Sequence, residues 1–136
     1  MPAIATYESR TITVRIERPL DEVYDFVYKP DNFPKWASGL STTLEKLDGQ
    51  WVADTPAGKV KIHFSEWNPF GVVDHIVVPK MGPEIHIPLR AIRNGEGTEV
   101  IFTLLRYPGV SDEHFSRDID WVTRDLHTLK KLLETS

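Results

Sequence analysis

His75 is the residue of this sequence best placed to do chemistry. Val73 and Val77 lie two positions to either side of it, so on a β-strand its side chain shares their apolar face. An imidazole in such a setting needs a hydrogen-bond partner, and it can titrate or hold a polar group of a ligand. The alternative is a structural histidine satisfied by a helix side chain or a backbone carbonyl. His75 is therefore the best candidate for a catalytic or ligand-binding residue, unless a local bulge turns Asp74 inward in its place.

Several other chemistries lack the residues they need. The sequence has no cysteine, which excludes disulfides, thiolate catalysis and cysteine-bound metals. Glu84 and His86 share a strand face, but no third ligand stands at a suitable spacing, so we expect no metal site. The Gly-x-Ser-x-Gly motif of a serine nucleophile and a glycine-rich phosphate loop are also absent from the sequence. We expect no cofactor.

The strand that carries His75 belongs to a series of strands separated by turns. Asp48-Gly49 is typical of a tight hairpin, and similar signals predict six strands, near residues 40–47, 50–55, 58–67, 71–79, 84–93 and 98–106. Pairing neighbouring strands about these turns keeps one apolar face continuous, and a slip of one residue would break it. The pairs are Trp51 with Ile62, Ala53 with Val60, Phe64 with His75, His75 with Ile87, Leu89 with Phe102, and Ile87 with Leu104.

Candidate ligand contacts share this face with His75. They are Thr42, Trp51, Thr55, Phe64, Ile87 and Phe102. A hydroxyl in an apolar pocket can orient a carbonyl or phenol, and a tryptophan ring offers a flat stacking surface. Strand propensity explains the threonines as well, and simple core filling explains the tryptophan.

Helices flank the run of strands. Ile12, Val14 and Ile16 alternate with polar residues and predict a first strand that ends before Pro19. Short helices are expected at residues 20–27 and 32–36, the second one broken by a proline. A long amphipathic helix follows Ser111, its N-cap, because apolar residues recur at spacings of 4, 3, 4, 3 and 4: Phe115, Ile119, Val122, Leu126, Leu129 and Leu133.

The long helix adds further candidates to the site. Asp118 and Asp125 flank Val122 on its apolar stripe, and either carboxylate could orient the His75 ring. Asp118 and Val122 are therefore expected beside the ligand. A first strand, two short helices, six further strands and a long helix together predict an α+β fold in which the helix covers one face of a sheet.

Composition limits the classes of function. The 136 residues suit one domain, residues 1–136, and 16 basic against 20 acidic side chains give a net charge of −4, which argues against nucleic acid as a partner. No apolar run reaches the roughly 18 residues of a membrane span, and no secretory signal is visible, so we expect a cytoplasmic protein. A homodimer is possible because the outer sheet face also carries apolar residues: Val72, Ile76, Val78, Ile92, Ile101 and Leu105.

The order of elements resembles the START-like superfamily, also called SRPBCC or helix-grip, and within it the polyketide cyclase/dehydrase-like branch. The most telling stretch is Ile16 to Trp36, IERPLDEVYDFVYKPDNFPKW. The resemblance implies a curved seven-stranded antiparallel sheet, two short helices after strand 1, and a long C-terminal helix on the concave face. It also implies a small apolar or aromatic ligand between sheet and helix. The alternatives are a cyclase or aromatase with His75 as general acid/base, and a protein-interaction module without a ligand.

Proline-rich turns mark one end of the predicted sheet. Alternate turns of an antiparallel meander lie at the same end, which groups Pro56 with the loops around Met81 and Tyr107 to Val110. In the family, loops at this end frame the cavity entrance. We therefore expect the mouth of the cavity at Pro56, Met81, Tyr107 and Val110.

Overall fold

The computed structural model describes residues 5–38, 43–55 and 58–135. Its elements are β1 (Ser9–Ile16), α1 (Leu20–Val27), the 3-10 helix η1 (Pro30–Lys35), β2 (Glu45–Leu47), β3 (Gln50–Thr55), β4 (Gly58–Phe64), β5 (His75–Pro79), β6 (Ile85–Ile87), β7 (Leu89–Asn94), β8 (Gly97–Leu105) and α2 (Asp112–Glu134). The mixed α+β class is as predicted. The eight strands form two antiparallel sheets, in the orders β1-β8-β7 and β2-β3-β4-β5-β6, and not the single seven-stranded sheet that was expected.

Pro88 explains one part of this difference. It has no backbone N–H, so the expected strand at residues 84–93 divides there into β6 and β7. Ile87 then pairs with His75 in one sheet, while Leu89 pairs with Phe102 in the other. The predicted pairing of Ile87 with Leu104 is not part of either ladder, although the Thr103 amide still donates to the Pro88 carbonyl at 3.0 Å. The predicted pairs on β3, β4 and β5 are confirmed: Trp51 with Ile62, Ala53 with Val60, and Phe64 with His75.

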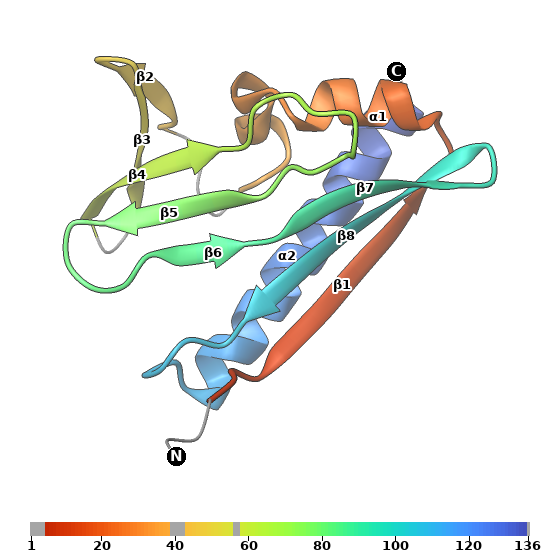
Figure 1. Ribbon diagram of the computed structural model, residues 1–136. Coiled ribbons are helices and arrows are strands. Elements are labelled where there is room, and N and C mark those ends of the chain that lie inside the picture. The colour runs from red at the N-terminus through yellow and green to blue at the C-terminus, as the bar shows by residue number, and fades with distance from the viewer. Residues whose placement is uncertain (1–4, 39–42, 56–57, 136) are drawn as a thin grey trace.

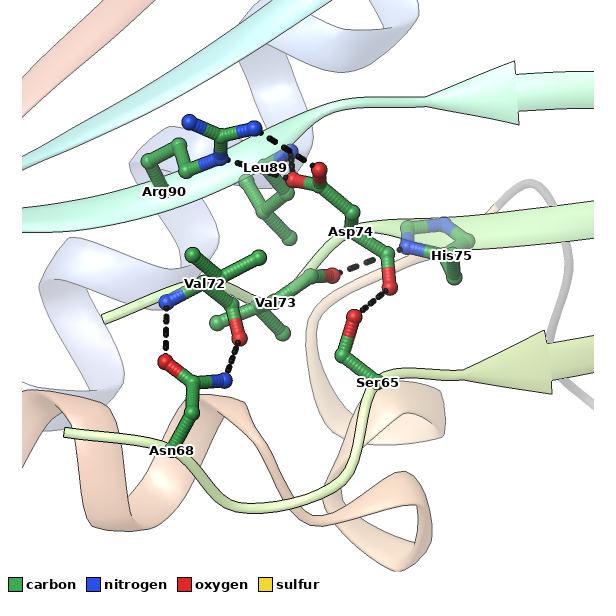
Figure 2. Close-up of polar contacts among 8 residues, drawn as sticks. All are labelled: Ser65, Asn68, Val72, Val73, Asp74, His75, Leu89 and Arg90. Atoms are coloured by element: carbon green, nitrogen blue, oxygen red, sulfur yellow. Dashed lines mark hydrogen bonds and ion pairs between the residues drawn. The ribbon is translucent and has the colours of Figure 1, made fainter. Parts of the chain in front are cut away.

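Side chains supplement a short stretch of backbone pairing just before β5. The expected strand at residues 71–79 begins only at His75, and Val72 makes an isolated bridge to Arg90 of β7. Figure 2 shows the Asn68 side chain closing on Val72: Nδ2 donates to its carbonyl at 2.8 Å and Oδ1 accepts from its amide at 3.1 Å. The Asp74 carboxylate accepts from the Leu89 amide at 2.9 Å. The two sheets therefore meet at a seam where these side-chain hydrogen bonds stand beside backbone ones, from the Val73 amide to the Leu89 carbonyl at 2.8 Å and from the Ala91 amide to the Gly71 carbonyl at 2.9 Å.

The short helices follow the predicted order. α1 begins after Pro19 and fully buries Val23 and Val27. The second element is a 3-10 helix at Pro30–Lys35 and not an α-helix at 32–36, because Pro34 lacks the N–H that a regular α-helix would use. Within it Phe33 is buried, and this side chain faces the pocket described below.

The long helix α2 lies across one face of the sheet formed by β1, β8 and β7 (Figure 1). Ser111 caps it as predicted, accepting a hydrogen bond from the His114 amide at 3.1 Å. Its last three turns bury Leu126, Leu129 and Leu133. In the part of the chain that the structure describes, no helix has the length and apolar character needed to cross a membrane.

Candidate ligand-binding site

A pocket of 350 Å³ lies between the strands and the middle of α2. Thr55 and His75 contribute to its wall, and Phe33, Trp36 and Ala37 come from η1 and the residues that follow it. The remaining lining residues are the apolar strand residues Val60, Val77, Pro79, Ile85, Ile87, Phe102 and Leu104, and the helix residues Asp118, Trp121, Val122 and Asp125. The lining is thus mostly apolar, with few polar groups.

The packing of α2 explains where this pocket forms. Its apolar stripe is continuous in the sequence, and Phe115 and Leu126 are buried. Ile119 and Val122 lie between them on the same stripe but are only half-buried, and Val122 faces the pocket. The middle of the helix therefore presents apolar surface that the core does not fill.

His75 is 3% exposed and forms part of the pocket wall. Its Nδ1 lies 3.3 Å from the Val73 carbonyl. A carbonyl can only accept a hydrogen bond, so Nδ1 carries the proton in this contact and Nε2 is left as an acceptor. No hydrogen bond to Nε2 is present among the described residues. The rings of Phe33 and Phe64 enclose the imidazole, with centroids 5.3 and 5.7 Å from its own.

Burial keeps the imidazole neutral. It lowers the pKa of His75 to about 4, although the Val73 carbonyl and the charge of Asp74 act in the opposite direction. Asp74 points to the other side of the strand, as Figure 2 shows, where its carboxylate meets the Arg90 guanidinium at 2.9 and 3.0 Å. Burial alone would raise the pKa of Asp74, but the hydrogen bonds from Arg90 and Leu89 outweigh it and hold that pKa below its ordinary value.

The two helix carboxylates on the pocket wall have partners away from His75. Asp118 Oδ2 lies 3.4 Å from His114 Nε2, and burial raises the pKa of Asp118 despite the opposing charges of His114 and Arg117. Asp125 accepts from the Ser38 amide at 3.2 Å and from its hydroxyl at 2.7 Å. A backbone carbonyl, and neither of these carboxylates, therefore orients the His75 ring.

Trp36 adds a polar group that the sequence did not single out. Trp36 is buried at 3% exposure, and its ring lies 5.1 Å from that of Phe33. It also lines the pocket, and its indole Nε1 is buried without a hydrogen-bond partner among the described residues. Buried indole N–H groups usually have a hydrogen-bond partner. The residue type alone, an aromatic side chain that carries an N–H, was the signal in the sequence for this polar group.

Most of the predicted ligand contacts come together, but two do not. Thr55, Ile87, Phe102, Asp118 and Val122 line the pocket with His75. Trp51 and Phe64 do not line it; Phe64 packs against the His75 ring, and Trp51 stands edge-on to Phe64 at 6.1 Å. Thr42 lies outside the described residues. Among these described residues, no three His, Cys, Asp or Glu side chains are grouped as metal ligands.

The predicted mouth residues are not at the pocket. Met81 is 89% exposed, and Tyr107 uses its hydroxyl to accept from the His86 amide at 2.8 Å. Neither of them nor Val110 belongs to the lining, and Pro56 lies outside the described residues. The most exposed lining side chains are instead Ile85 and Trp121, each more than a third exposed.

Comparisons with known proteins bear on the fold. Neither the models of known protein families nor the curated proteins gave a match. Among solved structures, DynU16, a protein in the dynemicin biosynthetic locus, has a TM-score of 0.69 and 19% identity, over 93% of this chain and 47% of that one. This chain thus spans about half the length of DynU16.

Two further solved structures match along nearly their whole length. The Aha1 dimer from Colwellia psychrerythraea has a TM-score of 0.69 and 17% identity, over 93% of this chain and 96% of that one. Ara h 8.0201 has a TM-score of 0.67 and 8% identity, over 95% of this chain and 99% of that one. The chain therefore shares the fold of these structures, the START-like or helix-grip fold that the sequence resemblance implied.

Proposed function

We propose that this protein, which has the helix-grip fold, binds a small apolar or aromatic molecule between its strands and α2. The observation that carries the proposal is a largely apolar pocket whose wall contains two polar groups without protein partners among the described residues, His75 Nε2 and Trp36 Nε1. Its volume of 350 Å³ lies within the range of small-molecule sites, roughly 300–1,000 Å³. An apolar wall with a few fixed polar groups is the usual composition of such sites.

The pKa of His75 favours binding over acid–base catalysis. A general acid or base works best when its pKa lies near the working pH. With a pKa of about 4, the imidazole is neutral near neutral pH, so it lacks the imidazolium proton that a general acid would donate and is a weak base. A cyclase or aromatase reaction through His75 is therefore the weaker candidate. An interaction module without a ligand gives no role to the half-buried apolar stripe around Val122.

Native mass spectrometry of freshly purified protein tests the proposal. We expect a co-purified small molecule, or binding from a panel of aromatic compounds, and the loss of both in Val122→Trp, which fills the pocket. Arg124→Trp is the matched control, because it adds the same side chain at an exposed position of α2 outside the lining. Unchanged binding by a folded Val122→Trp protein would contradict a site in this pocket.

A homodimer and a cytoplasmic location stay predictions. Of the six outer-face apolar residues, Ile92 is the most exposed, at 45%, and it lies on β7. One similar solved structure is described as a dimer, that of Aha1. Light scattering at high protein concentration should give the mass of two chains, and Ile92→Lys should lower it, whereas a monomer mass would exclude the dimer.

A further inference from the structure

The ionised side chains on the pocket wall carry one sign of charge. Asp118 and Asp125 both line it from α2, and its described lining contains no lysine or arginine. Asp125 accepts hydrogen bonds from the amide and the hydroxyl of Ser38, both of which are neutral groups. Burial raises the pKa of Asp118 against the charges of two groups on the same helix, the Arg117 guanidinium and the His114 ring, which lies at 3.4 Å and is charged only when it is protonated.

The neutral polar groups of the wall are mainly acceptors. His75 presents Nε2 as an acceptor because Nδ1 faces the Val73 carbonyl. The Thr55 hydroxyl donates to the Gly58 carbonyl at 2.7 Å, so toward the pocket it too can only accept. The indole of Trp121 already donates to Ser38 at 2.7 Å. Trp36 Nε1 is the remaining donor among these described residues.

We propose that the pocket selects an apolar ligand that carries a hydrogen-bond donor, such as a hydroxyl group, and no negative charge. The inference rests on the proposed function and names the chemical class of its ligand. A carboxylate on the ligand would add a negative charge beside Asp118 and Asp125, in a wall where apolar side chains weaken dielectric screening. It would also leave the His75 acceptor unsatisfied.

A ligand hydroxyl matches the two unpartnered groups. It can donate to His75 Nε2 and also accept from Trp36 Nε1, since a hydroxyl has one donor and two acceptor positions. Both rings contact Phe33, with centroids 5.3 Å from it for His75 and 5.1 Å for Trp36, so the two residues share a neighbour on the wall. A hydrocarbon without a donor would fill the same space but would leave both groups unpaired.

Three naphthalenes of similar size test the selection by calorimetric titration near neutral pH: 2-naphthol, 2-methylnaphthalene and 2-naphthoate. We expect 2-naphthol to bind at least about tenfold more tightly than 2-naphthoate, with 2-methylnaphthalene between them. Equal or tighter binding of 2-naphthoate would overturn the inference while supporting the proposed function. Binding of none of the three would count against both proposals.

Substitutions of single side chains test which residues of the pocket wall cause the preference for a neutral ligand with a hydroxyl group. Asp118→Asn should tighten 2-naphthoate binding several-fold, whereas Asp120→Asn, which removes the same charge from an exposed position of α2, should not. Equal effects would show that net charge, and not the pocket, rejects anions. His75→Phe should remove the advantage of 2-naphthol over 2-methylnaphthalene. If that protein does not fold, the comparison of the two aspartate variants still decides the charge selection.

Discussion

Burial of the His75 imidazole makes the stability of this protein depend on pH. The residue is 3% exposed, and burial lowers its pKa from 6.5 to about 4. Between these values the unfolded chain binds a proton that the folded protein does not, so the free energy of unfolding falls as the pH falls. The contribution of the neutral His75 imidazole to the free energy of unfolding is fully present above about pH 6.5 and is lost progressively down to about pH 4.

The magnitude follows from the two pKa values. Their difference, 6.5 − 4 = 2.5, corresponds to about 3 kcal/mol at ~1.4 kcal/mol per pKa unit. At about pH 5 the linkage relation gives a loss of roughly 2 kcal/mol relative to neutral pH. The carboxyl of Asp74, whose pKa lies below its ordinary value, loses its own contribution only at lower pH, below about 4.

Urea unfolding of wild type and His75→Phe, at neutral pH and at about pH 5, measures this contribution. The phenyl ring keeps an aromatic side chain in the buried position and removes the titrating group. We expect the wild type to lose roughly 2 kcal/mol more than His75→Phe over this range. His127→Phe is the matched control, because it removes a histidine from an exposed position, and it should keep the wild-type fall.

Two results would contradict this account. One is an equal fall in the free energy of unfolding for wild type and His75→Phe. The other comes from a direct titration of the folded wild-type protein by NMR, which does not depend on the variant folding. If the ring protons of His75 shift with a midpoint near 6.5 and not near 4, burial does not control this group.

Three further substitutions test the seam and the core by chemical denaturation. Asp74→Ala should cost about 1–3 kcal/mol because it leaves a β7 amide and a guanidinium without their carboxylate, whereas Asp54→Ala, which breaks an exposed pair with lysine, should change stability by less than about 1 kcal/mol. Leu129→Ala should cost about 2–5 kcal/mol, because this side chain is fully buried, and Leu132→Ala, 38% exposed, should cost less than about 1 kcal/mol. Gly71→Ala should cost at least about 1 kcal/mol, because φ is +71° and a Cβ would collide with the carbonyl of the β7 residue beside it; an unchanged midpoint would contradict that strain.

The sequence was informative where periodicity and burial act together. The 3- and 4-residue spacing of α2 and the alternation of β1 each specify a face, and the registers on β3, β4 and β5 follow because a slip would expose that face. The placement of His75 opposite Phe64 depends on the same rule. The order of the elements indicated the fold, and the stretch from Ile16 to Trp36 was the most telling part of that resemblance.

The seam and the pocket depend on interactions that no periodicity encodes. Pro88 lies within the expected strand at residues 84–93, and the Leu89 amide that follows it donates to Asp74, a partner that periodicity does not indicate. The pocket is a void, and a sequence gives the identity of side chains and not the space between them. Met81 was therefore placed at the mouth by turn parity alone, whereas Ile85 and Trp121 are the exposed lining residues.

The last turn of α2 is fastened to the end of β1 by groups that lie far apart in the sequence. Arg18 donates to the carbonyls of Leu133 and Glu134, and Lys130 donates to the carbonyl of Arg15, across separations of 115 or 116 residues. Closing a loop of this length costs about 4 kcal/mol by the logarithmic term alone. β1 also pairs with β8, which follows it by some 80 residues or more. High contact order of this kind predicts slow folding, in which β1 gains its neighbours only when the distant β8 and α2 arrive.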